Sequence, residues 1–341
     1  MASPPTMIEV QDLTKVYQAE RERSWGRAKP RDPGRRPAVD SVSFEVARGE
    51  LFVIMGLSGS GKSTLLRMLN RLVEPTAGTV TVDGVEISSA APRELRRLRN
   101  NTVNMVFQHF AIFPHRTLLE NVAYGLQIRG VPTAERVERA NWALNRVGLK
   151  DWGDELPSAL SGGMRQRVGL ARALATDAEI LLMDEPFSAL DPLIRRDMQD
   201  LLLDLQSQLK KTIVFVTHDL NEAMRLGERI MVMRDGKLIQ LGTGSDILSN
   251  PADDYVADFV SDVDRSRVVT AERVMREPAV MAGSTDLTNV ATVVKDTRLM
   301  DIFPLIGEGS TPVCVLDDSG RLVGEISSTT LVQALAGGRH A

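Results

Sequence analysis

The stretch MGLSGSGKST, residues 55 to 64, lies between the apolar run ELFVI and the helix-like segment LLRMLNRL. Its glycines, Lys62 and Ser63 fit the spacing G-x-x-x-x-G-K-[ST], in which small residues let backbone N–H groups curve around a phosphate at a helix N-terminus. Lys62 would reach the β- and γ-phosphates of a nucleotide, and the Ser63 hydroxyl would bind Mg²⁺. A glycine-rich turn without a ligand is the alternative, which the flanking strand and helix disfavour. The residues predicted to bind ATP here are Gly56, Leu57, Ser58, Gly59, Ser60, Gly61, Lys62, Ser63 and Thr64.

An acidic pair ends the apolar, strand-like run ILLMDEP. Asp184 would hold Mg²⁺ through water, and Glu185 would polarise an attacking water molecule. An ordinary exposed turn is the alternative, but the phosphate-binding motif earlier in the chain favours a catalytic pair. The pair therefore predicts hydrolysis of the bound nucleotide.

A second glycine-rich helix start lies in LSGGMRQRVGLARAL, residues 160 to 174. Ser161, Gly162 and Gly163 would present free N–H groups and the positive end of a helix dipole to an anion. Two such helix ends on one chain are redundant unless the second serves a nucleotide held by another copy of the chain. The sequence therefore indicates a dimer.

The elements that must position these motifs alternate between strand and helix patterns. Residues 7 to 17 alternate apolar and polar side chains, which predicts an edge strand, and GTVTVDGVEI predicts a hairpin with Asp83-Gly84 at its tip. Apolar residues at three- and four-residue spacing over residues 117 to 150 predict a helical insert, with limits at about 110 and 175. The remaining strand–helix–strand order predicts an α/β fold with a largely parallel sheet covered by helices.

Composition excludes several classes of protein. The 341 residues, 43% of them hydrophobic, suffice for a nucleotide-binding domain and a smaller appendage. A net charge of −4 argues against nucleic acid as a partner of the whole chain. Cys314 is the single cysteine, which excludes a disulfide framework, suits a reducing cytosol and predicts a buried, inert thiol. We expect neither a membrane span nor a signal peptide, because no long apolar run occurs and MASPPTMIEV lacks an apolar core.

Residues 18 to 37 form a basic insert with seven Arg and Lys residues, broken by Pro and Gly. We interpret it as a loop. A solvated loop without a partner is the favoured reading, and contact with anionic lipid head groups or a partner subunit is the alternative.

Together, these motifs resemble the ATP-binding subunits of ABC transporters over roughly residues 7 to 262. In that family GLSGSGKST is Walker A, ILLMDE is Walker B, LSGGMRQ is the signature, MVFQ is the Q-loop, SALD is the D-loop and VTHD is the H-loop. All six occur here in family order. The resemblance implies an α/β, ABC-type P-loop nucleotide-binding domain with a helical subdomain over residues 1 to 262, using ATP and Mg²⁺.

The resemblance also implies roles for single residues. Two copies would form a head-to-tail dimer that holds two ATP molecules, each between Walker A of one subunit and the signature of the other. Glu185 would be the general base, His218 would contact the γ-phosphate, and Gln108 would sense Mg²⁺ and link to the membrane subunit. Tyr17 resembles the aromatic residue that stacks on adenine, although the basic insert lengthens its separation from Walker A. The remaining implied sites are the signature residues Ser161, Gly162, Gly163 and Gln166, the D-loop residue Asp191, and the Mg²⁺ residues Ser63, Gln108 and Asp184.

Longer stretches, such as MVFQHFAIFPHRTLLENVAYGL and NPADDYVADFV, resemble the ATPase subunits of quaternary-amine importers. Those importers take up glycine betaine, proline betaine, choline or carnitine. The resemblance implies a peripheral protein at the cytoplasmic face of the bacterial plasma membrane, with two permease subunits and, indirectly, a solute-binding protein as partners. An importer ATPase for another small solute such as proline or histidine, a soluble non-transport ABC ATPase, and a regulatory module with incidental hydrolysis remain alternatives.

The tail, residues 263 to 341, resembles a truncated CBS module, a small α+β domain. TPVCVLDDSGRLVGEIS predicts a hairpin that turns at DDSG, STTLVQALAG predicts a helix, and TRLMDIFPLI predicts a helix that breaks near Pro304. Thr330 stands where the family often has an Asp that binds ribose. A dimerisation or packing domain is therefore favoured over adenosine-nucleotide sensing or gating by ionic strength.

Overall fold

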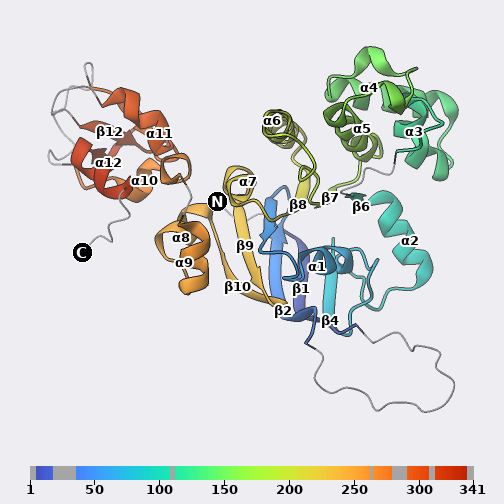
Figure 1. Ribbon diagram of the computed structural model, residues 1–341, viewed down its shortest axis with the longest axis horizontal. Helices are drawn as coiled ribbons and strands as arrows, with labels where there is room; N and C mark the ends of the chain where they lie inside the picture. Colours follow the sequence, from blue (N-terminus) through green and yellow to red (C-terminus); the bar gives the residue numbers. More distant parts are fainter. Residues whose placement is uncertain are drawn as a thin grey trace. The chain divides into compact units, whose positions relative to one another are not determined.

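The computed structural model describes residues 5–17, 36–107, 112–261, 264–278, 290–306 and 312–335 (Figure 1). The chain divides into two compact units, each described by itself below. The first comprises Met1–Glu222 and Met231–Ile239, and the second comprises Ala223–Ile230 and Gln240–Ala341. Among the described residues we find no helix with the length and hydrophobicity that a membrane span requires.

A six-stranded sheet carries the catalytic motifs. Its strand order is β10-β9-β3-β8-β7-β6, and β3, β8, β7 and β6 run parallel to one another. Every residue of β3, β7 and β8 is buried, as is typical of strands that are covered on both faces. The predicted parallel sheet is therefore confirmed. Its strands are β3 (Leu51–Met55), β6 (Val103–Val106), β7 (Ile180–Asp184), β8 (Thr212–Thr217), β9 (Arg229–Arg234) and β10 (Lys237–Gly242).

A second, four-stranded sheet has the order β2-β1-β4-β5, with antiparallel pairs throughout. The edge position predicted for residues 7 to 17 is wrong, because β1 pairs with β2 on one side and β4 on the other. Alternation of apolar and polar residues reports which faces of a strand are buried, and says nothing of its hydrogen-bonded edges. The predicted hairpin is confirmed, with positive φ at both Asp83 and Gly84. The strands are β1 (Thr6–Lys15), β2 (Val39–Ala47), β4 (Ala77–Val82) and β5 (Val85–Glu86).

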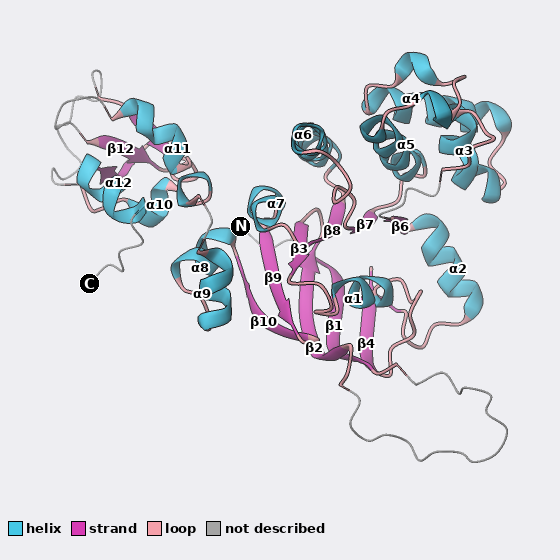
Figure 2. Ribbon diagram, in the orientation of Figure 1, coloured by secondary structure: helices cyan, strands magenta, loops and turns pink. Residues whose placement is uncertain are grey.

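Helices of the first unit lie beside the strands or in a separate cluster (Figure 2). α1 contacts β7 and β8, whereas α3, α4 and α5 contact one another. α3 begins at a capping box in which Thr117 and Glu120 satisfy each other's backbone N–H groups. The limits proposed for the helical insert, about 110 and 175, stay a prediction. The helices are α1 (Lys62–Met68), α2 (Pro92–Asn101), α3 (Leu118–Ile128), α4 (Thr133–Arg146), η1 (Lys150–Trp152), η2 (Pro157–Ala159), α5 (Gly162–Ala175), α6 (Pro192–Leu209) and α7 (Leu220–Leu226), the last of which continues into the second unit.

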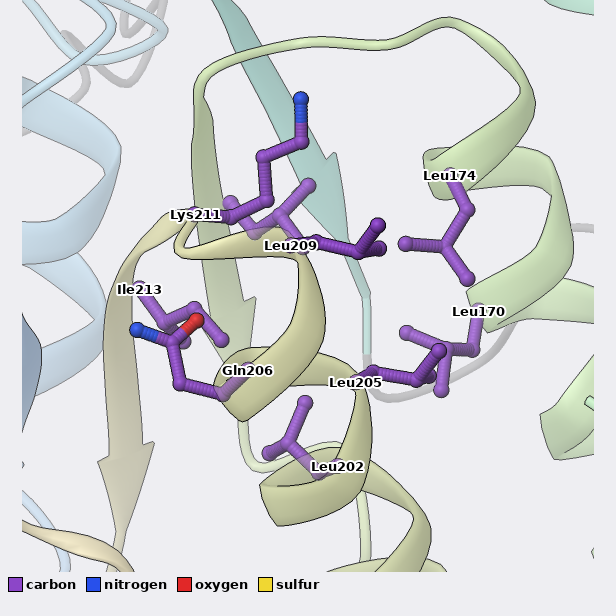
Figure 3. Close-up of a pocket in the computed structure, with 9 residues that line it drawn as sticks. Leu170, Leu174, Leu202, Leu205, Gln206, Leu209, Lys211 and Ile213 are labelled. Carbon is purple, nitrogen blue, oxygen red and sulfur yellow. The ribbon is translucent and has the colours of Figure 1, made fainter. Parts of the chain in front are cut away.

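Leucine side chains line a small pocket between α5 and α6 (Figure 3). The two polar side chains of its lining are engaged elsewhere, since Lys211 pairs with Asp177 and Gln206 donates to the carbonyl oxygen of Gly49. The Oε1 atom of Gln206 is buried without a hydrogen-bond partner among the described residues, and the remainder of the lining is mainly aliphatic. Its leucines are Leu170, Leu174, Leu181, Leu202, Leu205 and Leu209.

The second unit contains a three-stranded sheet of order β11-β12-β13. β11 and β12 are parallel, and β12 and β13 form the predicted hairpin, whose turn is held by the Asp317 carboxylate. The break near Pro304 is confirmed, because α11 ends at Ile302. Cys314 is buried, and burial raises the pKa of its thiol, as expected of an inert group. The elements are α8 (Gly244–Ser249), α9 (Asp254–Val260), η3 (Arg265–Arg267), α10 (Ala271–Val274), β11 (Thr292–Val294), α11 (Leu299–Ile302), η5 (Phe303–Leu305), β12 (Val313–Leu316), β13 (Leu322–Ile326) and α12 (Ser328–Leu335).

Candidate active site

The glycine-rich loop connects the end of β3 to the start of α1. Gly56 and Gly61 adopt φ angles of 148° and 99°. A Cβ atom on Gly56 would lie 2.2 Å from the carbonyl oxygen of Met233, and one on Gly61 would lie 2.2 Å from that of Ala38. Only glycine therefore fits at these two positions, for reasons of both backbone conformation and space. α1 lacks a side-chain cap, so its first N–H groups have no partner within the helix.

Lys62 is buried inside this loop. Its ammonium group donates to the carbonyl oxygens of Gly56 at 2.8 Å and Leu57 at 3.0 Å. Burial lowers the pKa of Lys62, and the charges of Glu185 and Asp184 oppose that shift. The loop thus holds a desolvated cation where the sequence predicts the phosphates to bind.

Ser63 and Asp184 meet at the carboxyl end of β7. The Ser63 hydroxyl donates to Asp184 Oδ1 at 2.7 Å, and the Arg67 guanidinium lies 3.1 Å from Asp184 Oδ2. A hydroxyl and a carboxylate are the hard oxygen ligands that Mg²⁺ prefers, and Mg²⁺ commonly takes one or two carboxylates beside water and phosphate. The residues therefore fit the predicted metal. Arg67 was not expected from the sequence, although its position four residues after Ser63 places both on one helix face.

Glu185 and His218 follow the adjacent parallel strands β7 and β8. His218 Nδ1 lies 3.0 Å from Glu185 Oε2. Glu185 has a φ angle of 45°, a left-handed conformation that is costly for a residue with a side chain. The chain bends sharply there, and the bend sets the carboxylate beside the imidazole.

Tyr17 lies near the start of α1 despite the intervening insert. Its hydroxyl is 3.4 Å from Thr64 Oγ1, and the Lys15 ammonium lies 5.2 Å from the ring centroid. The side chain is 47% exposed, which leaves part of the ring available to a ligand. Its position is compatible with the predicted stacking on adenine.

At the glycine-rich start of α5, Gly162 lies at the surface and Gly163 lies against α6. Ser161 caps the helix by accepting a hydrogen bond from the N–H group of Met164, and a Cβ atom on Gly162 would meet only open space. Gly163 instead packs against α6, where a Cβ atom would lie 2.4 Å from Ile194 Cγ2. Gly162 therefore has open space beside it, and the predicted contact of Ser161 and Gly162 with a second copy's nucleotide stays a prediction.

Gln166 is buried in the single chain, and its predicted contact with the partner's nucleotide stays a prediction. The residue is 2% exposed, and neither its amide nitrogen nor its amide oxygen has a hydrogen-bond partner among the described residues. Gln166 is three residues after Gly163 and so lies on the same side of α5 as that residue. The short motif did not reveal this because only tertiary packing decides which face of α5 is buried.

Of the remaining predicted residues, the structure describes Asp191 but not Gln108. The Asp191 carboxylate caps α6 by accepting hydrogen bonds from the N–H groups of Leu193 and Ile194. Gln108 lies outside the described residues, as do residues 18–35 of the basic insert.

Three comparisons describe what this chain is similar to. A family model described as ABC transporter matches residues 39–188. The glycine betaine transport ATP-binding protein of Bacillus subtilis is 43% identical, over 98% of this chain and 93% of that protein. The glycine betaine/carnitine transport ATP-binding protein of Listeria monocytogenes is 52% identical, over 83% of this chain and 74% of that protein. A solved dimeric structure of an ATP-binding cassette in a post-hydrolysis state, bound to ADP and Pi, is 35% identical with a TM-score of 0.60 and covers 70% of this chain and 99% of that one.

Proposed function

The chain belongs to the ATP-binding proteins of ABC transporters and is an ATPase, and we propose that it powers the uptake of quaternary amines of the glycine betaine type through separate permease subunits. The observation that carries the solute class is the similarity to a glycine betaine transport protein along 98% of this chain. That similarity includes the tail, which is beyond the part of the chain matched by the general family model.

Nucleotide binding would depend on the loop between β3 and α1. The buried Lys62 ammonium lies against two carbonyl oxygens, and an incoming phosphate would offer it a stronger, charged acceptor. The uncapped start of α1 would add backbone N–H donors. Tyr17 would stack on the base, and Ser63 and Asp184 would hold Mg²⁺, with Gln108 as a further contact. When bound, Mg²⁺ supplies positive charge that neutralises the phosphates.

Hydrolysis would depend on Glu185 and His218. Glu185 would accept a proton from the attacking water, and His218 would fix the orientation of that carboxylate through the 3.0 Å contact. His218 is half-exposed, so its ring can also reach the γ-phosphate predicted to lie beside it. A carboxylate that is held before the substrate arrives loses less conformational freedom in the transition state.

A second copy would complete each site. Ser161 and Gly162 would serve a nucleotide held by the other copy, and a Cβ atom on Gly162 would meet only open space. The similar cassette in its post-hydrolysis state is dimeric. Nucleotide that binds the closed dimer more tightly than the open one would shift the equilibrium toward closure, and hydrolysis would reverse it. We propose that this motion passes to two permease subunits at the cytoplasmic face of the plasma membrane, beside Gln108 and the helices α3 to α5.

The tail would act as a small packing or dimerisation domain of the CBS type. Thr330 is 1% exposed, and its hydroxyl lies 2.9 Å from Ser327 Oγ. A buried threonine in that position supports a structural role and disfavours ribose binding. Contact of the basic insert with anionic lipid stays a prediction.

Reconstitution tests the proposal. The protein would be purified with its two permease subunits and the solute-binding protein, placed in vesicles, and supplied with ATP. Uptake of labelled glycine betaine, proline betaine, choline, carnitine, proline and histidine would be measured beside a Glu185→Gln control. ATP-dependent uptake of betaines supports the proposal. Uptake confined to proline or histidine would favour the alternative amino-acid importer, and purification with ribosomes or DNA would favour a non-transport ATPase.

A further inference from the structure

Arg195, in the first turn of α6, forms hydrogen bonds to two loop segments. One follows β7 and the other follows β8. Its NH1 atom lies 2.8 Å from Asp219 Oδ2, and its NH2 atom donates to the carbonyl oxygen of Leu190 at 3.1 Å. Leu190 directly precedes Asp191, and Asp219 directly follows His218. One guanidinium group therefore connects the segment before α6 to the segment that carries the histidine.

The guanidinium group of Arg195 binds its two acceptors in a fixed geometry. The side chains of Arg195 and Asp219 are 28% and 30% exposed, and the Nε atom of Arg195 is buried without a hydrogen-bond partner among the described residues. A guanidinium group is planar and presents its donors in fixed directions, so two acceptors on different segments are held at a set separation. Such a pair controls the position of its two segments more than the stability of the fold, because ion pairs that keep contact with solvent contribute little free energy.

A second contact, between α6 and α7, lies one helical turn further along α6. Gln199 donates to Glu222 at 3.1 Å, and both side chains are buried. Arg195 and Gln199 are four residues apart and so share one face of α6.

The segment that carries His218, residues 217 to 222, also contains hydrogen bonds of its own. Asp219 Oδ1 accepts the N–H group of Glu222 at 3.1 Å, while the N–H group of Asp219 donates to Thr217 Oγ1 at 2.9 Å. His218 therefore lies between two residues whose positions are set by hydrogen bonds, and Arg195 fixes the one that follows it.

We propose that Arg195 is a positioning residue that keeps His218 beside Glu185 and ties this placement to the Asp191 segment. The inference rests on the proposed function, because the Asp191 segment is expected to face the second copy. A shift of that segment during dimer closure would move the Leu190 carbonyl, and Arg195 would carry the shift to Asp219 and His218. Within the part of the chain that the structure describes, Arg195 forms hydrogen bonds to Asp219 and Leu190 and none to the phosphate-binding loop, so we expect hydrolysis, and not nucleotide affinity, to depend on it.

ATP turnover by the full-length protein tests this inference. We would compare wild type with Arg195→Ala, Arg195→Lys, Asp219→Asn and the double variant Arg195→Ala/Asp219→Asn. Arg196→Ala is the matched control, since it removes the same charge from the next, exposed residue of α6. Each protein would be examined for kcat, KM for ATP, equilibrium binding of a fluorescent ATP analogue and thermal unfolding.

We expect Arg195→Ala to lower kcat by about 10- to 100-fold with KM changed by less than about twofold, because the lost contact orients a catalytic group without touching the substrate. Asp219→Asn should behave alike, the double variant should lose no more than the worse single variant, and Arg195→Lys should recover part of kcat. Arg196→Ala should match wild type.

Three outcomes would overturn the inference: a kcat for Arg195→Ala equal to that of Arg196→Ala, additive losses in the double variant, or a parallel loss of ATP affinity and melting temperature. If Arg195→Ala does not fold, Asp219→Asn decides, because it keeps the shape of the side chain and removes its charge. A protein that hydrolyses ATP but transports no betaine would contradict the proposed function alone, since turnover is the readout here.

Discussion

His218 Nδ1 and Glu185 Oε2 lie 3.0 Å apart although the two residues are 33 positions apart in the chain. The contact forms because β7 and β8 are neighbouring parallel strands, paired at Asp184 and Val216, which end at the same edge of the sheet. It places the carboxylate of the proposed general base beside the imidazole ring.

Replacement of Glu185 by Gln should separate binding from turnover. The amide keeps the size of the side chain but cannot accept a proton from water, so we expect ATP binding and a stable ATP-bound dimer, with kcat lower by about 100-fold or more. Single-turnover hydrolysis and gel filtration with ATP and Mg²⁺ would measure the two effects. Near-normal hydrolysis would contradict the role of Glu185 as general base, and a persistent monomer would contradict the ATP-bound dimer.

Two neighbouring glycines provide a matched pair for the start of α5. Gly163→Ala should destabilise the protein by about 1–3 kcal/mol, because its methyl group would overlap Ile194. Gly162→Ala has space within the chain and should leave stability unchanged or raise it by at most about 1 kcal/mol.

The Gly162→Ala variant should nevertheless lose ATP turnover, because its methyl group would stand where the second copy's nucleotide is expected. Denaturant unfolding and steady-state hydrolysis would be measured on both variants. Full turnover by a normally folded Gly162→Ala protein would show that this helix end serves no nucleotide.

Ser63 should determine how strongly Mg²⁺ assists nucleotide binding. Ser63→Ala removes the hydroxyl that lies 2.7 Å from Asp184, so we expect an affinity for Mg²⁺–ATP lower by on the order of 10-fold and little change for ATP in EDTA. Ser63→Thr is the control, because the motif accepts either hydroxyl. Titration calorimetry with and without Mg²⁺ would measure the difference, and an equal loss under both conditions would contradict a metal-binding role.

Glu222 should make stability depend on pH. Burial raises the pKa of its carboxyl group above the ordinary value of 4.5. Between 4.5 and the raised value the folded protein binds more protons than the unfolded chain, so this contribution to the free energy of unfolding is full below pH 4.5 and declines as pH rises.

Glu222→Gln keeps an oxygen acceptor for Gln199 and cannot ionise, so its stability relative to wild type should increase as pH rises. Urea unfolding of both proteins from about pH 5 to 8 would measure the difference, in which other titrating groups largely cancel. A difference that does not vary with pH would contradict the assigned titration.

Removal of residues 263–341 tests the tail. A packing or dimerisation domain predicts that any dependence of uptake on salt concentration is the same in truncated and full-length protein. Vesicle uptake over a series of salt concentrations would measure this, with ATP turnover as the control for folding of the remaining chain. Loss of salt dependence on truncation would favour gating by ionic strength instead.

Local spacing was sufficient to locate the loop between β3 and α1 and the acidic pair, because these features depend on residues close together in the chain. Gly56, Lys62 and Ser63 lie within eight consecutive residues, and Asp184 and Glu185 are adjacent at the end of β7. The apolar runs of β3, β7 and β8 likewise identified strands buried in a parallel sheet.

Contacts between distant segments were decided by tertiary structure alone. The sequence placed β1 at an edge, yet it lies between two strands, because backbone pairing leaves no mark on side-chain alternation. Gln166 is buried and Gly162 is not, a difference that the motif itself does not contain. The clasp of Arg195 on Leu190 and Asp219 joins segments that follow different strands. The sequence pattern indicates the chemistry that each side chain offers. Which distant residues surround and orient that side chain is decided only when strands and helices pack together.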